Sequence, residues 1–399
     1  MEPVTANVKW YDETNIGKLM WPDTEYGRYA KKYILPLMIG QSVSSYIHNV
    51  RTRLLVVTVD GIPLPVTVND MEYDNSYVCS PYTHYVTYAG EELANLRSRP
   101  AEVLLGGMLN MIGQLLRRAR FNRVIQVNNW ILSTNLYPVL TPGQLEAVID
   151  ELQQHYPRHA ILCRSLNRAA SGRLLDAMKE KGCKLVPSRQ IYLLHGRQEQ
   201  DMAFAEAAAP HPVNAKARWL VKRDRGLIRK QGYSISGPSD MQPDDAPRIK
   251  QLYDMLYIHK YSACNPQFTE QFIQLAIETG TLELYGLRKN GRLDAVLGFF
   301  AREGIMTAPL FGYDTTLPQK TGLYRMLSAV LIGIAEERGL LLHESSGVGQ
   351  FKRNRGAVAE LEVTAVFDRH LPFLTRVCWT ILEKLLWSIG VPIIRKLKL

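Results

Sequence analysis

The sequence predicts an α/β fold of two tandem domains, in which each domain has a mixed, mostly antiparallel sheet flanked by helices. Three observations predict this arrangement. The chain has 399 residues, which is too long for one ordinary hydrophobic core. Its second half orders its expected elements as two helices, a run of antiparallel strands, and a helix that crosses over to a further strand. The first half follows a weaker version of the same plan, which indicates an internal duplication.

The pattern of apolar residues predicts the elements of the second half in turn. Apolar residues at three- and four-residue intervals predict a helix over 244–258, and a second helix is expected over 269–279. Asn290-Gly291 separates two apolar runs, which predicts a hairpin with strands over 282–287 and 293–301. The elements expected after the hairpin are a strand over 305–313, a helix over 321–338, and strands over 340–344 and 361–368.

The first half begins with a similar hairpin. Asp60-Gly61 joins apolar runs over 54–59 and 63–68, and the prolines of the second run place that strand toward an edge. A tyrosine-rich run over 77–88 then predicts a further strand. The elements expected after it are helices over 100–120, 144–155 and 171–181, and strands over 123–127, 160–165 and 184–194.

One helix–strand unit aligns the two halves. Residues 100–127 fall on residues 318–345 at an offset of 218, and the match lies in the pattern of apolar positions more than in residue identity. We therefore divide the chain into a degenerate first domain (1–200), a linker with a basic helix (201–240), a second domain that carries the site (241–370) and a C-terminal amphipathic helix with a basic tail (371–399).

Composition and charge describe an ordinary globular protein. Hydrophobic residues make up 46% of the chain and charged residues 22%, and the net charge is +10. This charge suits a nucleic acid, an anionic membrane surface or an anionic cofactor, and it also occurs in basic proteins without such partners. The five cysteines are scattered without a C-x-x-C pair, and Pro157 breaks the only helical pair of histidines, so we expect neither disulfides nor a metal site.

The ends of the chain bear on localisation. The first residues lack the basic-then-apolar order of a signal peptide, and no run of about 18 uncharged apolar residues occurs, so we expect a cytoplasmic protein without a spanning helix. The C-terminal segment 371–399 combines an apolar stripe with a basic tip. It suits either a helix docked on the first domain or on a partner, or a peripheral contact with an anionic membrane.

A turn before the helix over 321–338 is the most informative local feature. The sequence Gln319-Lys-Thr-Gly-Leu323 follows a strand and opens that helix. The first N–H groups of a helix have no partner within it, and they lie at the positive end of its dipole. Such a position suits a pyrophosphate or the anionic part of a cofactor.

This turn and the order of elements resemble the acyl-CoA site of the GNAT acyltransferase superfamily. The tandem arrangement is similar to that of the Fem-type peptidyltransferases and their BioF2-like acyltransferase relatives. Residues 260–269 (KYSACNPQFT), the hairpin of the second half and residues 349–357 (GQFKRNRGA) carry the resemblance. Tyr324 departs from it, because the family has a small residue at the corresponding position of the turn.

The resemblance implies roles for individual residues. The acyl-CoA site would comprise Gln319, Lys320, Thr321, Gly322 and Leu323. Glu344 at a strand end would take the proton of an attacking amine, and Tyr313 would protonate the leaving thiolate. The residues that would bind the substrate are Tyr261, Asn265, Ser345, Lys352 and Arg355. Each of these side chains could equally be an ordinary polar residue at a strand end or in a loop.

The sequence therefore favours an N-acyltransferase that moves an acyl group from acyl-CoA, for example acetyl-CoA, to an amine of a small-molecule or peptide-like acceptor, without a metal. A second hypothesis is a Fem-type ligase that uses aminoacyl-tRNA, which the net charge and the basic run over 216–230 favour. A third is a binding protein that has kept the fold and lost the chemistry. The sequence leaves the oligomeric state open.

Overall fold

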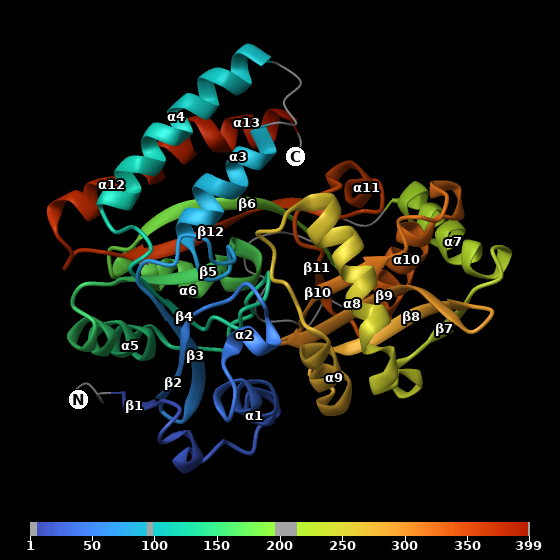
Figure 1. Cartoon of the computed structure of the whole chain (residues 1–399), viewed down its shortest axis with the longest axis horizontal. Coiled ribbons are helices and arrows are strands. Elements are labelled where there is room, and N and C mark those ends of the chain that lie inside the picture. The colour runs from blue at the N-terminus through green and yellow to red at the C-terminus, as the bar shows by residue number, and fades with distance from the viewer. Residues whose placement is uncertain (1–5, 94–98, 196–213, 398–399) are drawn as a thin grey trace.

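The computed structural model describes residues 6–93, 99–195 and 214–397. A twelve-stranded sheet runs through the molecule in the order β1-β2-β3-β4-β5-β12-β6-β11-β10-β9-β8-β7 (Figure 1). Its strands are β1 (Val8–Tyr11), β2 (Arg53–Val59), β3 (Ile62–Asn69), β4 (Val124–Val127), β5 (Ala160–Leu166), β6 (Lys184–Leu194), β7 (Ser234–Ser236), β8 (Glu283–Lys289), β9 (Arg292–Arg302), β10 (Ile305–Tyr313), β11 (Leu341–His343) and β12 (Val358–Phe367).

Helices connect and cover these strands. They are α1 (Glu25–Met38), α2 (Val43–Tyr46), α3 (Tyr88–Leu93), α4 (Arg99–Arg118), α5 (Pro142–His155), α6 (Arg168–Glu180), α7 (Ala215–Lys230), α8 (Ala246–Tyr253), α9 (Glu270–Thr279), α10 (Leu323–Glu337), α11 (Gly349–Arg353), α12 (Phe373–Leu385) and α13 (Val391–Leu397). Most of the helices and strands expected in the second half are present. The segment Asp201–Pro212, part of the expected linker, lies outside the described residues.

The two halves repeat one arrangement of strands and helices, and they exchange their last strands. In each half a hairpin leads to a parallel pair joined by a helix, which is β4-α5-β5 in the first half and β10-α10-β11 in the second. The last strand of each half then pairs with the other half: β12 lies against β5, and β6 lies against β11. Because β6 and β12 also pair with each other, the sheet is continuous across both halves.

The expected duplication is present, but its alignment at an offset of 218 residues is wrong. Asp60-Gly61 and Asn290-Gly291 occupy the same hairpin turn, and all four residues have positive φ, as a type I′ turn requires. The sheet order then matches β4 with β10 and α5 with α10. The alignment failed because α3 and α4 are inserted between β3 and β4, whereas β9 continues into β10 through a tight turn.

The strand expected over 77–88 is also wrong. This segment forms a turn, the π-helical turn η2 (Thr83–Thr87) and the start of α3. Tyr85 and Val86 are buried against Leu116 of α4 and its neighbours. Aromatic and β-branched residues favour a strand only where a pleated surface receives them, and here a helical surface does.

The C-terminal residues form one long helical stretch through α12, the π-helical turn η8 (Leu386–Gly390) and α13. Phe373–Arg395 has a mean hydropathy of 1.5 and is long enough to cross a membrane, a test that core helices of soluble proteins also pass. The expectation that no such segment occurs was therefore too strict. The inner side of α12 is docked on the first half, where Trp379 packs against Phe121 with ring centroids 4.0 Å apart.

Candidate functional site

The candidate site begins where two parallel strands separate. β10 and β11 pair only as far as Thr307↔His343, and β10 then continues to Tyr313 without this neighbour. Beyond His343 the chain bonds to β6 instead, because the Glu344 N–H donates to the Tyr192 carbonyl. The separation leaves one side of β10 open beside the polar end of β11.

A cavity of about 330 Å³ lies at this separation, and both halves line it. Ala308 and Phe311 of β10 and Ser328 of α10 contribute from the second half, and His84 of η2 from the first. Six tyrosines dominate its wall, namely Tyr77, Tyr85, Tyr88, Tyr257, Tyr261 and Tyr324. The cavity can therefore hold an organic group against aromatic faces and hydroxyl groups.

Glu344 brings a carboxyl group to this cavity. Its Oε2 atom is buried and has no hydrogen-bond partner among the described residues. Burial raises the pKa of Glu344, and the cations of Lys352 and Arg355 oppose this shift. A buried carboxyl with a free oxygen and a raised pKa is suited to accept a proton near neutral pH.

Lys352 also lines the cavity, but backbone carbonyls engage its ammonium group. Nζ donates to the carbonyls of Glu344 and Ser346 at 2.6 and 2.8 Å, with the Ser345 carbonyl at 3.4 Å. Burial lowers the pKa of Lys352 to about 8, and Glu344 opposes this shift. Lys352 therefore holds the loop after β11 in place, including Ser345 with its positive φ of 58°.

Arg355 lies away from the cavity, in a buried ion-pair cluster. Its guanidinium pairs with Asp224 of α7, which is 0% exposed, and donates to the Phe351 carbonyl at 2.9 Å. Arg325 of α10 binds the same carboxylate at 2.5 Å. Asp224 thus ties α7 to α10 and α11, and this pairing occupies the guanidinium that we expected to bind substrate.

The Gln319–Leu323 turn does not line the cavity either. Gln319, Lys320 and Thr321 form the short 3₁₀ turn η7, and Gly322 adopts a left-handed φ of 78° before α10 begins. A Cβ on Gly322 would lie 3.2 Å from the Leu227 side chain of α7, so α7 packs directly beside the turn. The exposed part of the turn is on its Gln319 and Lys320 side.

The structure brings together part of the expected acceptor pocket. Tyr261, Asn265 and Ser345 all line the cavity, together with Glu344. Tyr313 does not line it and packs against Tyr324, with ring centroids 6.3 Å apart. Tyr324, which stands where the family has a small residue, forms part of the cavity wall.

A buried polar chain at the cavity was missed by sequence reasoning. Arg189 of β6 donates Nε to Glu362 of β12 at 2.9 Å, and the His343 ring lies 3.6 Å from the same carboxylate. Burial alone would raise the pKa of Glu362, but Arg189 and His343 outweigh it and hold that pKa at about 2. Arg189 lies on β6, which is far in sequence from β11 and β12, so no local motif could have revealed its pairing with Glu362.

The low pKa of Glu362 predicts a loss of stability in acid. The folded value of about 2 lies below the ordinary value of 4.5, so the stabilisation is fully present above pH 4.5 and is lost as the pH falls toward 2. The 2.5-unit difference corresponds to about 3 kcal/mol. We expect the difference in unfolding free energy between wild type and Glu362→Gln to shrink by this amount between pH 7 and pH 2 in urea titrations. A difference in unfolding free energy that stays the same at both pH values would contradict this role of Glu362.

Two further side chains of the cavity form a hydrogen bond that the sequence did not suggest. Ser188 Oγ of β6 lies 2.9 Å from His84 Nε2. Burial, together with the nearby cations of Arg164 and Arg189, lowers the pKa of His84 to about 3. The imidazole is therefore neutral and is a weak base, so the pair is suited to bind a polar group rather than to activate Ser188.

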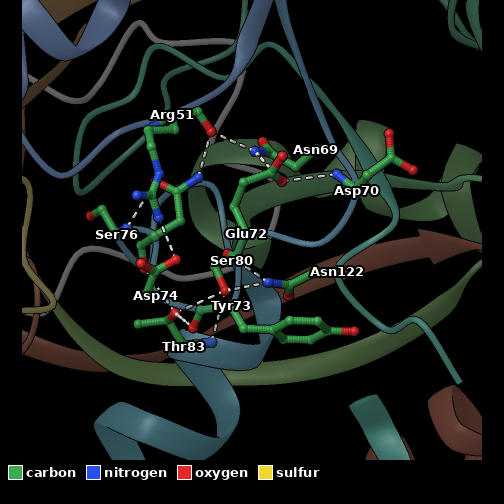
Figure 2. A network of polar contacts seen from close by, with 11 residues as sticks. Arg51, Asn69, Asp70, Glu72, Tyr73, Asp74, Ser76, Ser80, Thr83 and Asn122 are labelled. Carbon is green, nitrogen blue, oxygen red and sulfur yellow. Dashed lines mark hydrogen bonds and ion pairs between the residues drawn. The ribbon is translucent and has the colours of Figure 1, made fainter. Parts of the chain in front are cut away.

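A polar network fixes the first-half wall of the cavity (Figure 2). The Asn122 side chain accepts from the Tyr82 N–H at 2.9 Å and donates to Ser80 Oγ and the Glu72 carbonyl at 2.8 and 2.9 Å. Ser80 in turn bonds to Thr83, the first residue of η2. The network therefore orients the helical turn that carries His84 and Tyr85 into the cavity.

We expect Asn122→Ala to lower the free energy of unfolding by about 2–3 kcal/mol, because it leaves buried donors and acceptors without partners. Urea denaturation measures this change. Asn110→Ala on the exposed face of α4 is the matched control and should change stability by less than about 0.5 kcal/mol. Equal effects of the two substitutions would show that the network does not stabilise the fold.

The strand order repeats one α/β arrangement in both halves, as expected for tandem GNAT-like domains, and the cavity lies in the second half, where β10 separates from β11. No protein-family model matches the sequence, and no curated protein matches it. Within the described residues no three metal-binding side chains cluster.

Solved structures with a similar fold include L-PGS from Bacillus licheniformis, FemX and a GCN5-related N-acetyltransferase from Kribbella flavida. L-PGS is 14% identical, with a TM-score of 0.43 over 61% of this chain and 78% of its own. FemX is 8% identical, with a TM-score of 0.43 over 61% and 79%. The Kribbella protein is 12% identical, with a TM-score of 0.31 over 62% and 81%. Because these identities and TM-scores are low, our description of the fold rests on the strand order of this chain itself.

Proposed function

We propose that the protein transfers an acyl or aminoacyl group to an amine in the cavity between its two halves. The observation that carries this proposal is the Glu344 carboxyl, buried at the separation of β10 and β11 with Oε2 unpartnered and its pKa raised. A protonated amine entering the cavity would satisfy that oxygen. The tyrosine faces around it favour a cation as well.

The chemistry follows from these groups. Glu344 removes a proton from the ammonium or from the attacking amine, and the amine nitrogen attacks the carbonyl carbon of the donor. The bond from that carbon to the leaving group breaks, and the leaving group takes up a proton. Among the tyrosines that line the cavity we assign this donor role to Tyr324, because burial raises its pKa, so that its phenol stays protonated and can donate. It replaces Tyr313, which lies outside the cavity, in this role.

Acyl-CoA is our first candidate for the donor. The open side of β10 beside the cavity offers a place for an extended acyl carrier, and the Gln319–Lys320 end of the turn is exposed for its phosphates. Leu227 limits how closely a pyrophosphate can approach Gly322. The phosphates of an acyl-CoA donor would therefore lie at the exposed Gln319–Lys320 end of the turn, and not against Gly322.

Aminoacyl-tRNA is a second candidate, which the surface of α7 favours. This helix packs on α10 and carries an exposed Trp219 next to Arg223, whose guanidinium carbon lies 5.0 Å from the ring centroid. Its exposed cations are Lys216, Arg218, Lys222, Arg223, Arg225, Arg229 and Lys230. Such a row of cations suits the phosphates of a nucleic acid.

Thermal unfolding with acetyl-CoA, longer acyl-CoAs and charged tRNA distinguishes the donors, because a ligand that binds only the folded state raises Tm. An acyl-CoA donor should raise Tm at low and at moderate salt. A tRNA donor should bind steeply more weakly as salt rises, and Lys222→Glu with Arg229→Glu should reduce its binding. Absence of any shift with every donor would favour a protein that has lost the chemistry.

A further inference from the structure

The outward face of the C-terminal helical stretch is apolar. Six of its large apolar side chains are exposed, namely Phe373, Leu374, Ile381, Trp387, Ile389 and Ile393, and Phe373 is 79% exposed. α4 packs against α12 at the same end of the molecule (Figure 1). It adds Val103 and Met111, which are 76% and 68% exposed. Apolar exposure on this scale marks an interaction surface.

The charges on this face are of one sign. Arg376, Lys384 and Arg395 are exposed along the same stretch. Glu383 is the only acidic residue of Phe373–Arg395, and its carboxylate faces inward and accepts from the Leu185 N–H at 2.9 Å. The outward face therefore combines apolar side chains with cations, which is the pattern of a helix that lies on an anionic lipid surface.

We propose that the outward face of α12, η8 and α13 docks on an anionic lipid bilayer, with the helix axis in the plane of the surface. The inner face is already packed on the first half through Trp379, so the stretch lies on the bilayer rather than across it. A second copy of the chain fits less well, because pairing two such faces would bring Arg376 and Lys384 of both copies together.

The docking surface is continuous with the cavity. Leu386 and Ile394 of the same helical stretch line the cavity wall. A molecule seated on a bilayer would therefore hold one wall of its cavity next to the lipid. It follows that the acceptor is an amphiphile, with its amine in the cavity and its apolar chain in the bilayer. This substrate class, unlike the docking, rests on the function proposed above.

Vesicle flotation tests the docking. The full chain should float with vesicles of phosphatidylcholine that contain 30% phosphatidylglycerol, and should stay in the dense fraction with phosphatidylcholine alone. The triple variant Phe373→Ser, Ile381→Ser, Ile389→Ser should lower the bound fraction about tenfold at limiting lipid. Arg376→Glu with Lys384→Glu should lower the bound fraction about tenfold as well, because two cations that attract the anionic lipid become carboxylates that it repels.

The control variants are matched in chemistry and lie elsewhere. Met20→Ser with Val139→Ser replaces exposed apolar residues, and Lys31→Glu with Lys32→Glu reverses exposed charges on α1. Both should float like wild type. No flotation of wild type, or equal flotation of the triple variant, would overturn the proposal. So would a dimer in light scattering that the triple variant converts to a monomer.

Transfer assays test the substrate class separately. The triple variant should lower transfer to an amine-bearing lipid in vesicles and leave transfer to the same headgroup without acyl chains unchanged. Equal effects on both acceptors would overturn the amphiphile assignment. Flotation without transfer to any amine would leave the docking intact and would count against the proposed function alone.

Discussion

Replacing Asp224 with asparagine is expected to lower the free energy of unfolding by about 3–5 kcal/mol, because it leaves buried guanidinium groups without their counter-charge. Asp224 is fully buried and binds Arg355 and Arg325 at once. Arg355 is itself buried and carries most of the penalty, whereas Arg325 is partly exposed and can be hydrated. The same change should loosen α7 from α10.

Urea denaturation followed by circular dichroism measures the loss, and hydrogen exchange of α7 shows where it occurs. Asp244→Asn is the matched control, since this aspartate is exposed, and it should change stability by less than about 0.5 kcal/mol. If Asp224→Asn were as stable as wild type, the ion-pair cluster would not hold α7 in place. The exposed cations of α7 would then have no fixed position beside α10.

Replacing Glu344 with glutamine is expected to lower kcat/KM by about 10²–10⁴-fold, because the amide keeps the shape of the side chain and cannot accept the proton. Folding should be unaffected or improved, since burial of the ionised carboxylate is unfavourable, as the raised pKa of Glu344 indicates. Wild-type activity should rise with pH as Glu344 ionises, and the midpoint should lie above the ordinary glutamate value of 4.5.

Glu278→Gln on the exposed side of α9 is the control for the chemical change itself. It should leave both the rate and its pH dependence as in wild type. A Glu344→Gln enzyme with full activity, or with the same pH midpoint as wild type, would remove Glu344 from the mechanism. Lys352→Met would then be the next variant to measure, because burial lowers the pKa of Lys352 to about 8.

Much of the second half could be predicted because its signals are local. Asn290-Gly291 fixes a hairpin turn, and the alternation around it fixes the two strands. The exchange of β6 and β12 could not be predicted, because strand partners depend on contacts between segments some 170 residues apart. The tyrosines over 77–88 were assigned to a strand because their composition favours one, and only the tertiary packing makes the segment helical.

The site was predictable to a similar extent. Glu344 directly follows the strand after the helix of the parallel unit, so its position could be expected from the order of elements. Asp224 and Glu362 could not be found, because each binds arginines that are more than 100 residues away. The reason that Arg355 does not enter the cavity lies in that same long-range pairing.

The most direct measurement follows a labelled acyl group from donor to amine. Wild type, Glu344→Gln and Glu278→Gln would be incubated with labelled acetyl-CoA or labelled aminoacyl-tRNA and with a mixture of primary amines, and the label in the amide product would be counted. Our account predicts transfer from one of these donors by wild type and by Glu278→Gln, and at least a hundredfold less by Glu344→Gln. Equal transfer by all three proteins, or none from either donor, would contradict it.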